Sequence, residues 1–174
     1  MFDWFAVKYP AVFAQLDAAD QDSPARWAQL YKNTPWARGN ATRGEQIFAE
    51  RGCAVCHSGS KLIGPDLAGA AQRFSPEDLF NAIVFPSRDV APAYRMTTFQ
   101  LRNGEAYSGI VAFESADGVM IHTGMGTTLR LNDADIASRQ PSALSFMPAG
   151  LLGGASPQDL ADLYAYLKTL QAGR

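Results

Sequence analysis

The chain has 174 residues, of which 47% are hydrophobic and 18% are charged, so it can form one domain with additions or two small domains. Its 15 basic and 17 acidic residues leave a formal charge of -2, without the basic excess that is typical of nucleic-acid binders. The sequence has no apolar run near the ~18 residues that a membrane span requires, and its start lacks the basic and apolar segments of a secretory signal, so we expect neither feature.

Residues 1–42 predict an N-terminal helical extension with two helices. The apolar face of the first consists of Phe2, Phe5, Val12, Phe13 and Leu16. Ser23 and Pro24 are typical N-cap and first-turn residues, and they predict the start of the second. Its apolar face consists of Trp27, Leu30 and Tyr31. These aromatic side chains either cover a bound group, dock another module or fill the core, and core packing is the simplest interpretation.

Both cysteines of the chain lie in the segment Cys53-Ala54-Val55-Cys56-His57, which follows a short helix predicted over 43–50. The pattern C-x-x-C-H is the signature of covalent c-type haem attachment. One helical turn places Cys53 and Cys56 on the same face, so their thiols can add to the two vinyl groups of one porphyrin. His57 can then coordinate the iron through Nε2. The segment therefore predicts one covalent haem c.

The Nδ1 atom of His57 then needs an acceptor that fixes the orientation of the ring. The segment Gly64-Pro65-Asp66-Leu67 follows closely, and the carbonyl of Pro65 is free to accept. We therefore expect a hydrogen bond from His57 Nδ1 to the Pro65 carbonyl. Arg73 is a candidate contact for a haem propionate, as are Trp36 and Arg38.

Three other interpretations of the cysteine pair compete with haem. A structural zinc site needs four nitrogen or sulfur ligands, and the chain has four candidates, which are Cys53, Cys56, His57 and His122. Because His57 is the next residue after Cys56, the two side chains have little room to take up tetrahedral geometry around one zinc ion. A thioredoxin-like redox pair would need a βαβ context, which the sequence does not indicate. The third interpretation is a simple disulfide.

The middle of the chain predicts a helix and then a sheet. A helix begins at Ser75-Pro76 and ends before Pro86, and a loop follows over 86–93. From residue 94 to about 140 the hydrophobic period changes to two, and Asn103-Gly104 is a strong hairpin signal. We expect four or five short antiparallel strands, as a small curled sheet or an SH3-like barrel. An exposed strand edge of this sheet could pair with a second copy of the chain, so a homodimer is an alternative.

Met147 is the best candidate for the sixth iron ligand. It lies in a loop expected over 141–152, where Pro148 keeps it extended. A thioether ligand favours reduced iron and raises the potential. The competing candidates are Met96, Met120, Met125 and His122. The alternative interpretation is that Met147 fills space in the core.

The last helix begins at Ser156-Pro157. Its buried stripe consists of Leu160, Leu163, Tyr164 and Leu167. We expect the helices near 44–52 and 157–170 to pack across each other at one edge of the haem.

The order of these features resembles that of a class I c-type cytochrome. The features are Gly44, Ile47-Phe48, the haem motif, Gly64-Pro65-Asp66-Leu67, Met147-Pro148 and Tyr166-Leu167. The central part resembles more closely the haem-binding domain found C-terminally in large secreted bacterial multidomain proteins. That similarity rests on 79–86, Tyr94, Asn103-Gly104, Gly109 and the segment from Ser145 to Leu151. It covers roughly residues 43–171 and implies haem c with His57 and Met147 as axial ligands.

Together these features predict an α+β protein. A cytochrome c haem domain would consist of 43–93 and 141–174, with a β-strand insert at 94–140. We expect an electron-transfer protein rather than an enzyme, with an unidentified redox partner. A haem enzyme, a gas sensor with an open sixth position, or an interaction module built on the insert remain alternatives. Because thioether attachment takes place outside the cytoplasm, we expect a periplasmic or otherwise exported protein whose signal was removed.

Overall fold

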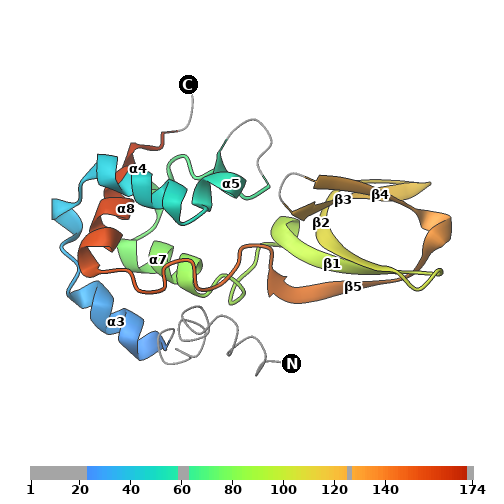
Figure 1. The fold of residues 1–174 in the computed structure, drawn as a ribbon, viewed down its shortest axis with the longest axis horizontal. Coiled ribbons are helices and arrows are strands. Elements are labelled where there is room, and N and C mark those ends of the chain that lie inside the picture. Colours follow the sequence, from blue (N-terminus) through green and yellow to red (C-terminus); the bar gives the residue numbers. More distant parts are fainter. Residues whose placement is uncertain (1–22, 59–62, 125–126, 172–174) are drawn as a thin grey trace, which may run out of the picture.

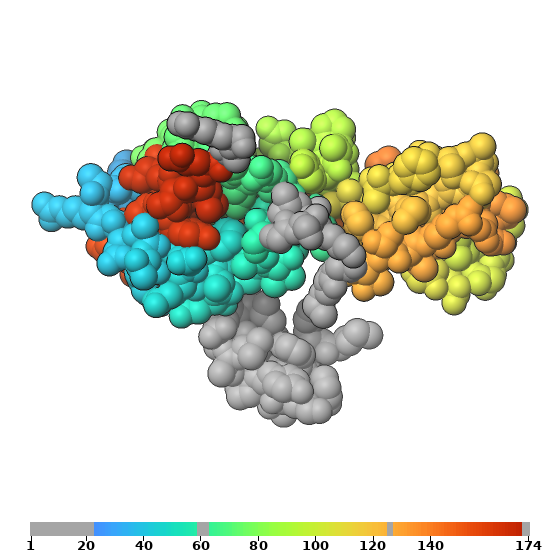
Figure 2. Space-filling model, turned by 90° about the horizontal axis from the view of Figure 1, so that it is seen from above, coloured from blue at the N-terminus to red at the C-terminus, as the bar shows by residue number. Residues whose placement is uncertain are grey.

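The computed structural model describes residues 23–58, 63–124 and 127–171 (Figure 1). Helices and an antiparallel sheet form two parts that lie side by side along the long axis, as the space-filling view also shows (Figure 2). The chain passes from the helices to the sheet after α7 and returns before α8. The helix expected around Phe2 to Leu16 lies outside the described residues. Among the helices described, none is long and apolar enough to cross a membrane.

Three helices begin at the predicted Ser-Pro pairs, the helix predicted over 43–50 begins two residues earlier, and a short helix at 70–73 was not predicted. The described helices are α3 (Pro24–Lys32), α4 (Ala41–Glu50), α5 (Cys53–His57), α6 (Ala70–Arg73), α7 (Pro76–Val84) and α8 (Pro157–Thr169), with a 3-10 turn η1 (Trp36–Arg38). Ser23, Ser75 and Ser156 cap α3, α7 and α8, each accepting the backbone N–H of the third residue after it. Helix α7 ends at Val84, before Pro86, as predicted.

Helices α4 and α8 cross in direct backbone contact, which confirms their predicted packing. A Cβ atom on Gly44 would lie only 2.0 Å from the carbonyl oxygen of Asp162 in α8. The rings of Phe48 and Tyr166 pack beside this crossing with their centroids 5.3 Å apart. The buried carboxylate of Asp162 accepts the backbone N–H of Asn40 at 2.7 Å, where α4 begins. A glycine at position 44 is therefore what allows the close approach.

One apolar core joins the helices. It includes Trp27 and Tyr31 of α3, Phe80 of α7 and Leu160 of α8, all at most 4% exposed. The aromatic residues of the second N-terminal helix therefore pack in the same core as α8, as the simplest interpretation predicted. The Tyr31 hydroxyl is buried with no hydrogen-bond partner among the described residues, and burial raises the pKa of Tyr31 to about 12.

The sheet has five antiparallel strands in the order β4-β3-β2-β1-β5. They are β1 (Arg95–Leu101), β2 (Ala106–Ser115), β3 (Gly118–Gly124), β4 (Thr127–Asn132) and β5 (Ile136–Ser145). Two 3-10 turns precede β1 and β5, which are η2 (Pro92–Tyr94) and η3 (Asp133–Asp135). The hairpin predicted at Asn103-Gly104 joins β1 to β2, and Gly104 has the positive φ of 91° that such turns require.

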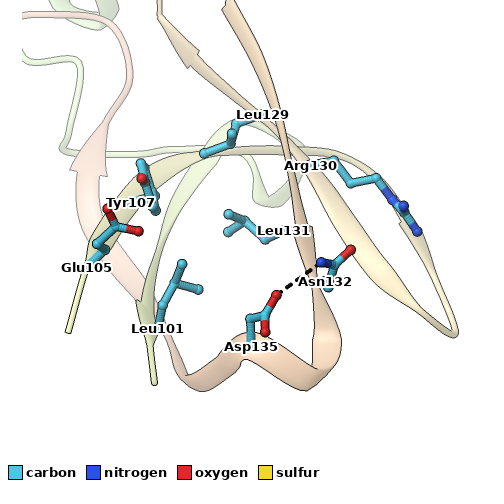
Figure 3. Close-up of a pocket in the computed structure, with 8 residues that line it drawn as sticks. All are labelled: Leu101, Glu105, Tyr107, Leu129, Arg130, Leu131, Asn132 and Asp135. Carbon is cyan, nitrogen blue, oxygen red and sulfur yellow. Dashed lines mark hydrogen bonds between the residues drawn. The ribbon is translucent and has the colours of Figure 1, made fainter. Parts of the chain in front are cut away.

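The sheet curls around its own small core, with β3 and β4 on one side and β1 and β5 on the other (Figure 1). That core centres on Phe99, Val119 and Ile121, which are at most 1% exposed. At one end the curl leaves a hollow of about 180 Å³, where Leu101, Leu129 and Leu131 converge (Figure 3). The strands predicted from the hydrophobic period are therefore present, as a curled sheet.

The last strand extends beyond the expected start of the methionine loop. Residues 141–145, which were expected in that loop, belong to β5 and pair with β1 as far as Arg95 and Ser145. Pro141 lies within the strand opposite Thr97. Because β5 is at the edge of the sheet, a residue without an N–H is tolerated there. The loop that carries Met147 is consequently shorter than predicted and begins at the end of a strand.

Candidate haem site

The two cysteines and His57 form one short helix. Gly52, with a φ of 76°, turns the chain sharply after α4 and starts α5. Cys53 and Cys56 are one turn apart and half-buried, and no disulfide joins them. Burial raises the pKa of the Cys53 thiol. The side chain of Val55, between them, is 61% exposed, so this turn lies at the surface.

The loop that contains Gly64 and Pro65 folds over the imidazole of His57. The Nδ1 atom of His57 lies 2.9 Å from the carbonyl oxygen of Pro65, which is the contact predicted from the sequence. The N–H of Gly64 donates to the carbonyl of Cys56 at 3.0 Å. A Cβ atom on Gly64 would lie 2.6 Å from Cε1 of His57. The loop thus holds the ring through one acceptor and one close backbone approach, and leaves Nε2 for a ligand.

Met147 follows directly on the sheet. It is half-buried, and its backbone N–H donates to the hydroxyl of Ser145, the last residue of β5, at 3.1 Å. The N–H of Ser145 in turn donates to the hydroxyl of Ser87, after α7, at 3.0 Å. The start of the methionine loop is therefore attached to the helical part.

The competing ligand candidates lie in the sheet. Met96 is on β1 and Met120, which is 38% exposed, is on β3. His122 is also on β3, and its Nδ1 lies 3.0 Å from the hydroxyl of Thr128. Met125 lies outside the described residues.

Arg73 lies on the surface at the end of α6. Its guanidinium donates to the carbonyl of Ala68 at 3.2 Å. Gly69 and Ala70, between them, begin the same turn. A propionate contact at Arg73 stays a prediction.

The residues around this site fit a porphyrin. Helix α7 has a buried stripe of Phe80 and Val84, but Leu79 and Ile83 on its other side are only partly covered. Leu67, next to the loop that holds His57, is likewise only partly covered. A flat apolar group at this site would meet two thiols on one turn and an oriented imidazole, with the half-covered Leu67 beside the loop that holds this imidazole.

The four candidate zinc ligands are not brought together in the structure. Within residues 23–58, 63–124 and 127–171, no group of three or more His, Cys, Asp or Glu side chains could hold a metal ion. His122 is on the sheet, whereas the cysteines and His57 are on α5.

A comparison with family models finds one similarity in this part of the chain. Residues 39–113 match the model described as cytochrome c oxidase, cbb3-type, subunit III. This match supports a cytochrome c-like haem domain in that part of the chain. The match covers less than half of the 174 residues, beginning before α4 and ending within β2. The cytochrome c-like match thus contains the haem motif and the loop that holds His57. A search of curated proteins found no match.

Two residues of the cytochrome c-like site have partners that sequence reasoning missed. Gly64 was noted only as part of a motif, yet it is the residue that contacts the imidazole. Arg51 donates to the carbonyls of Leu151 and Gly153, about a hundred positions away. A glycine beside Pro65 is a weak signal of close packing, whereas nothing in the sequence around Arg51 indicates its partners.

Proposed function

We propose that this protein transfers single electrons through one covalent haem c, with thioether bonds to Cys53 and Cys56 and with His57 and Met147 as axial ligands. The observation that carries the proposal is the set of groups on α5, where two thiols and an imidazole held by Pro65 lie within one short helix. The crossing of α4 and α8 supports a class I arrangement around it. The cytochrome c-like match supports the electron-transfer role.

The residues of the chain have separate tasks in this function. When bound, the haem supplies reversible one-electron chemistry at iron. His57 coordinates through Nε2, while its Nδ1–H donates to Pro65 and keeps the tautomer and the ring orientation constant. The thioether of Met147 favours the reduced metal. Leu67, which is only partly covered, follows Pro65 and would be covered further by a bound haem.

The way in which haem c is attached supports an exported location for this protein. Thioether attachment takes place outside the cytoplasm, where cysteines are presented reduced to the haem. We therefore propose a periplasmic or otherwise exported location. Covalent haem in protein that was never exported would contradict it.

The main test uses the protein matured in a host that attaches haem c. The denatured wild-type polypeptide should keep its haem, and the ferric protein should show a sulfur-to-iron charge-transfer band. Met147→Ala should lose that band and lower the reduction potential by on the order of 100 mV, because axial ligands tune haem potentials over ~0.8 V.

Met96→Ala is the matched control, since Met96 lies on β1 and should leave both readouts unchanged. A wild type that is high-spin and binds cyanide or carbon monoxide readily would instead support a haem enzyme or a gas sensor. In that case His122 and Arg95 are the candidate distal groups, although Arg95 Nε already donates to the Val90 carbonyl at 3.0 Å.

A second role concerns the sheet. Phe113 on β2 pairs with Met120 on β3, and Met120 pairs with Arg130 on the edge strand β4. Phe113 and Met120 are 60% and 38% exposed, so an exposed apolar pair lies one strand inside the open edge of β4. This favours association with a second copy of the chain, which sedimentation of wild type and Phe113→Ser would detect; a monomeric wild type excludes it.

A further inference from the structure

A side chain from another segment, that of Arg51, donates hydrogen bonds to the loop after Met147. Arg51 donates from Nη1 to the carbonyl of Gly153 at 2.8 Å and to that of Leu151 at 3.2 Å. These carbonyls flank Leu152, which is only 2% exposed and packs in the helical core. The guanidinium therefore binds the loop where it enters the core, and it satisfies two carbonyl groups that no helix or strand pairs.

Arg51 itself projects from a well-defined position. It ends α4, and its backbone N–H donates to the carbonyl of Ile47 at 2.9 Å. Helix α4 is in backbone contact with α8 at Gly44. Only Gly52 separates Arg51 from Cys53, so the arginine belongs to the same segment as the haem-binding cysteines.

The loop has a second attachment upstream of Met147. There Ser145 is bonded to Ser87, and the Ser145 hydroxyl accepts the N–H of Met147. Met147 therefore lies between an anchor on the sheet side and the anchor that Arg51 makes. Without Arg51, the downstream half would keep its apolar contacts through Leu152 and Ala155 but would lose the hydrogen bonds from the guanidinium.

We propose that Arg51 is a positioning residue for the axial methionine, tying the loop of Met147 to the segment that carries Cys53, Cys56 and His57. This rests on the proposed His57 and Met147 ligation. Hydrogen bonds from a charged donor are stronger than those between neutral groups, so one guanidinium is enough to restrain the loop. A restrained loop keeps the thioether in place, because a ligand that has already lost its freedom returns to the iron faster than an external one arrives.

The test measures how easily an external ligand displaces Met147. Imidazole is titrated into the ferric holoprotein while the sulfur-to-iron band is followed. We expect Arg51→Ala to bind imidazole about tenfold more tightly than wild type, the factor expected for one charge-assisted hydrogen bond. Arg51→Lys retains the charge and at least one donor, so its imidazole affinity should lie between those of wild type and Arg51→Ala. This variant replaces Arg51→Ala in the test if Arg51→Ala folds poorly.

Two controls separate this role from general stability. Arg43→Ala removes an arginine of the same helix whose Nη1 bonds Glu50 at 3.2 Å, and it should match wild type. Ser75→Ala removes the cap of α7 and lowers the free energy of unfolding without touching the methionine loop. It should not change imidazole affinity.

The outcomes separate the two proposals. A wild type without the sulfur band overturns Met147 ligation and with it this role of Arg51. A wild type that has the band, with Arg51→Ala and Arg51→Lys indistinguishable from Arg43→Ala, overturns the role of Arg51 alone. The same conclusion follows if Arg51→Ala alters imidazole affinity no more than Ser75→Ala does.

Discussion

Replacing Gly44 with alanine should lower the free energy of unfolding by about 3 kcal/mol, the upper range for overpacking. On an exposed helix the same change would be stabilising by about 1 kcal/mol, because alanine is the better helix former. Here the added Cβ would lie 2.0 Å from the carbonyl oxygen of Asp162 and 2.8 Å from the Cβ of Tyr166. Backbone cannot move aside as a side chain can, so α4 and α8 must separate.

Urea unfolding of the Gly44→Ala protein measures the effect. Glu45→Ala is the matched control, since Glu45 is the next residue and is exposed, and its substitution should stay within about 0.5 kcal/mol. A Gly44→Ala protein as stable as wild type would show that the two helices do not approach so closely.

Replacing Gly64 with alanine should displace the imidazole of His57. The new Cβ would lie 2.6 Å from Cε1 and 2.9 Å from Nδ1, and a ring that moves away loses the Pro65 carbonyl. Changes to groups that orient a metal ligand typically weaken metal binding about 10–100-fold. We therefore expect the ferric protein to gain a high-spin component that the wild type lacks.

Electron paramagnetic resonance of the ferric protein measures this component. The denatured Gly64→Ala polypeptide should still carry haem, because both thioether bonds remain. Pro65→Ala keeps the accepting carbonyl and should stay low-spin, which makes it the matched control. If Gly64→Ala were also low-spin, the imidazole would not depend on this close approach.

Much of the local structure followed from short patterns in the sequence. The Ser-Pro pairs at 23, 75 and 156 predicted three helix starts because capping depends on neighbours along the chain. The turn at Asn103-Gly104 was predicted for the same reason. The end of β5 was not, because its pairing with β1 continues through Pro141, where sequence alone favours a loop.

The sequence by itself determined the chemistry of α5, since the spacing of Cys53, Cys56 and His57 is a local property that one helical turn converts into geometry. It also indicated Pro65, eight residues further, whose carbonyl lies at the expected atom. Only the tertiary structure decided what surrounds them. The contacts of Gly44 with Asp162 and of Arg51 with the loop of Met147 join residues about a hundred positions apart, and such pairs form only when α4 and α8 pack.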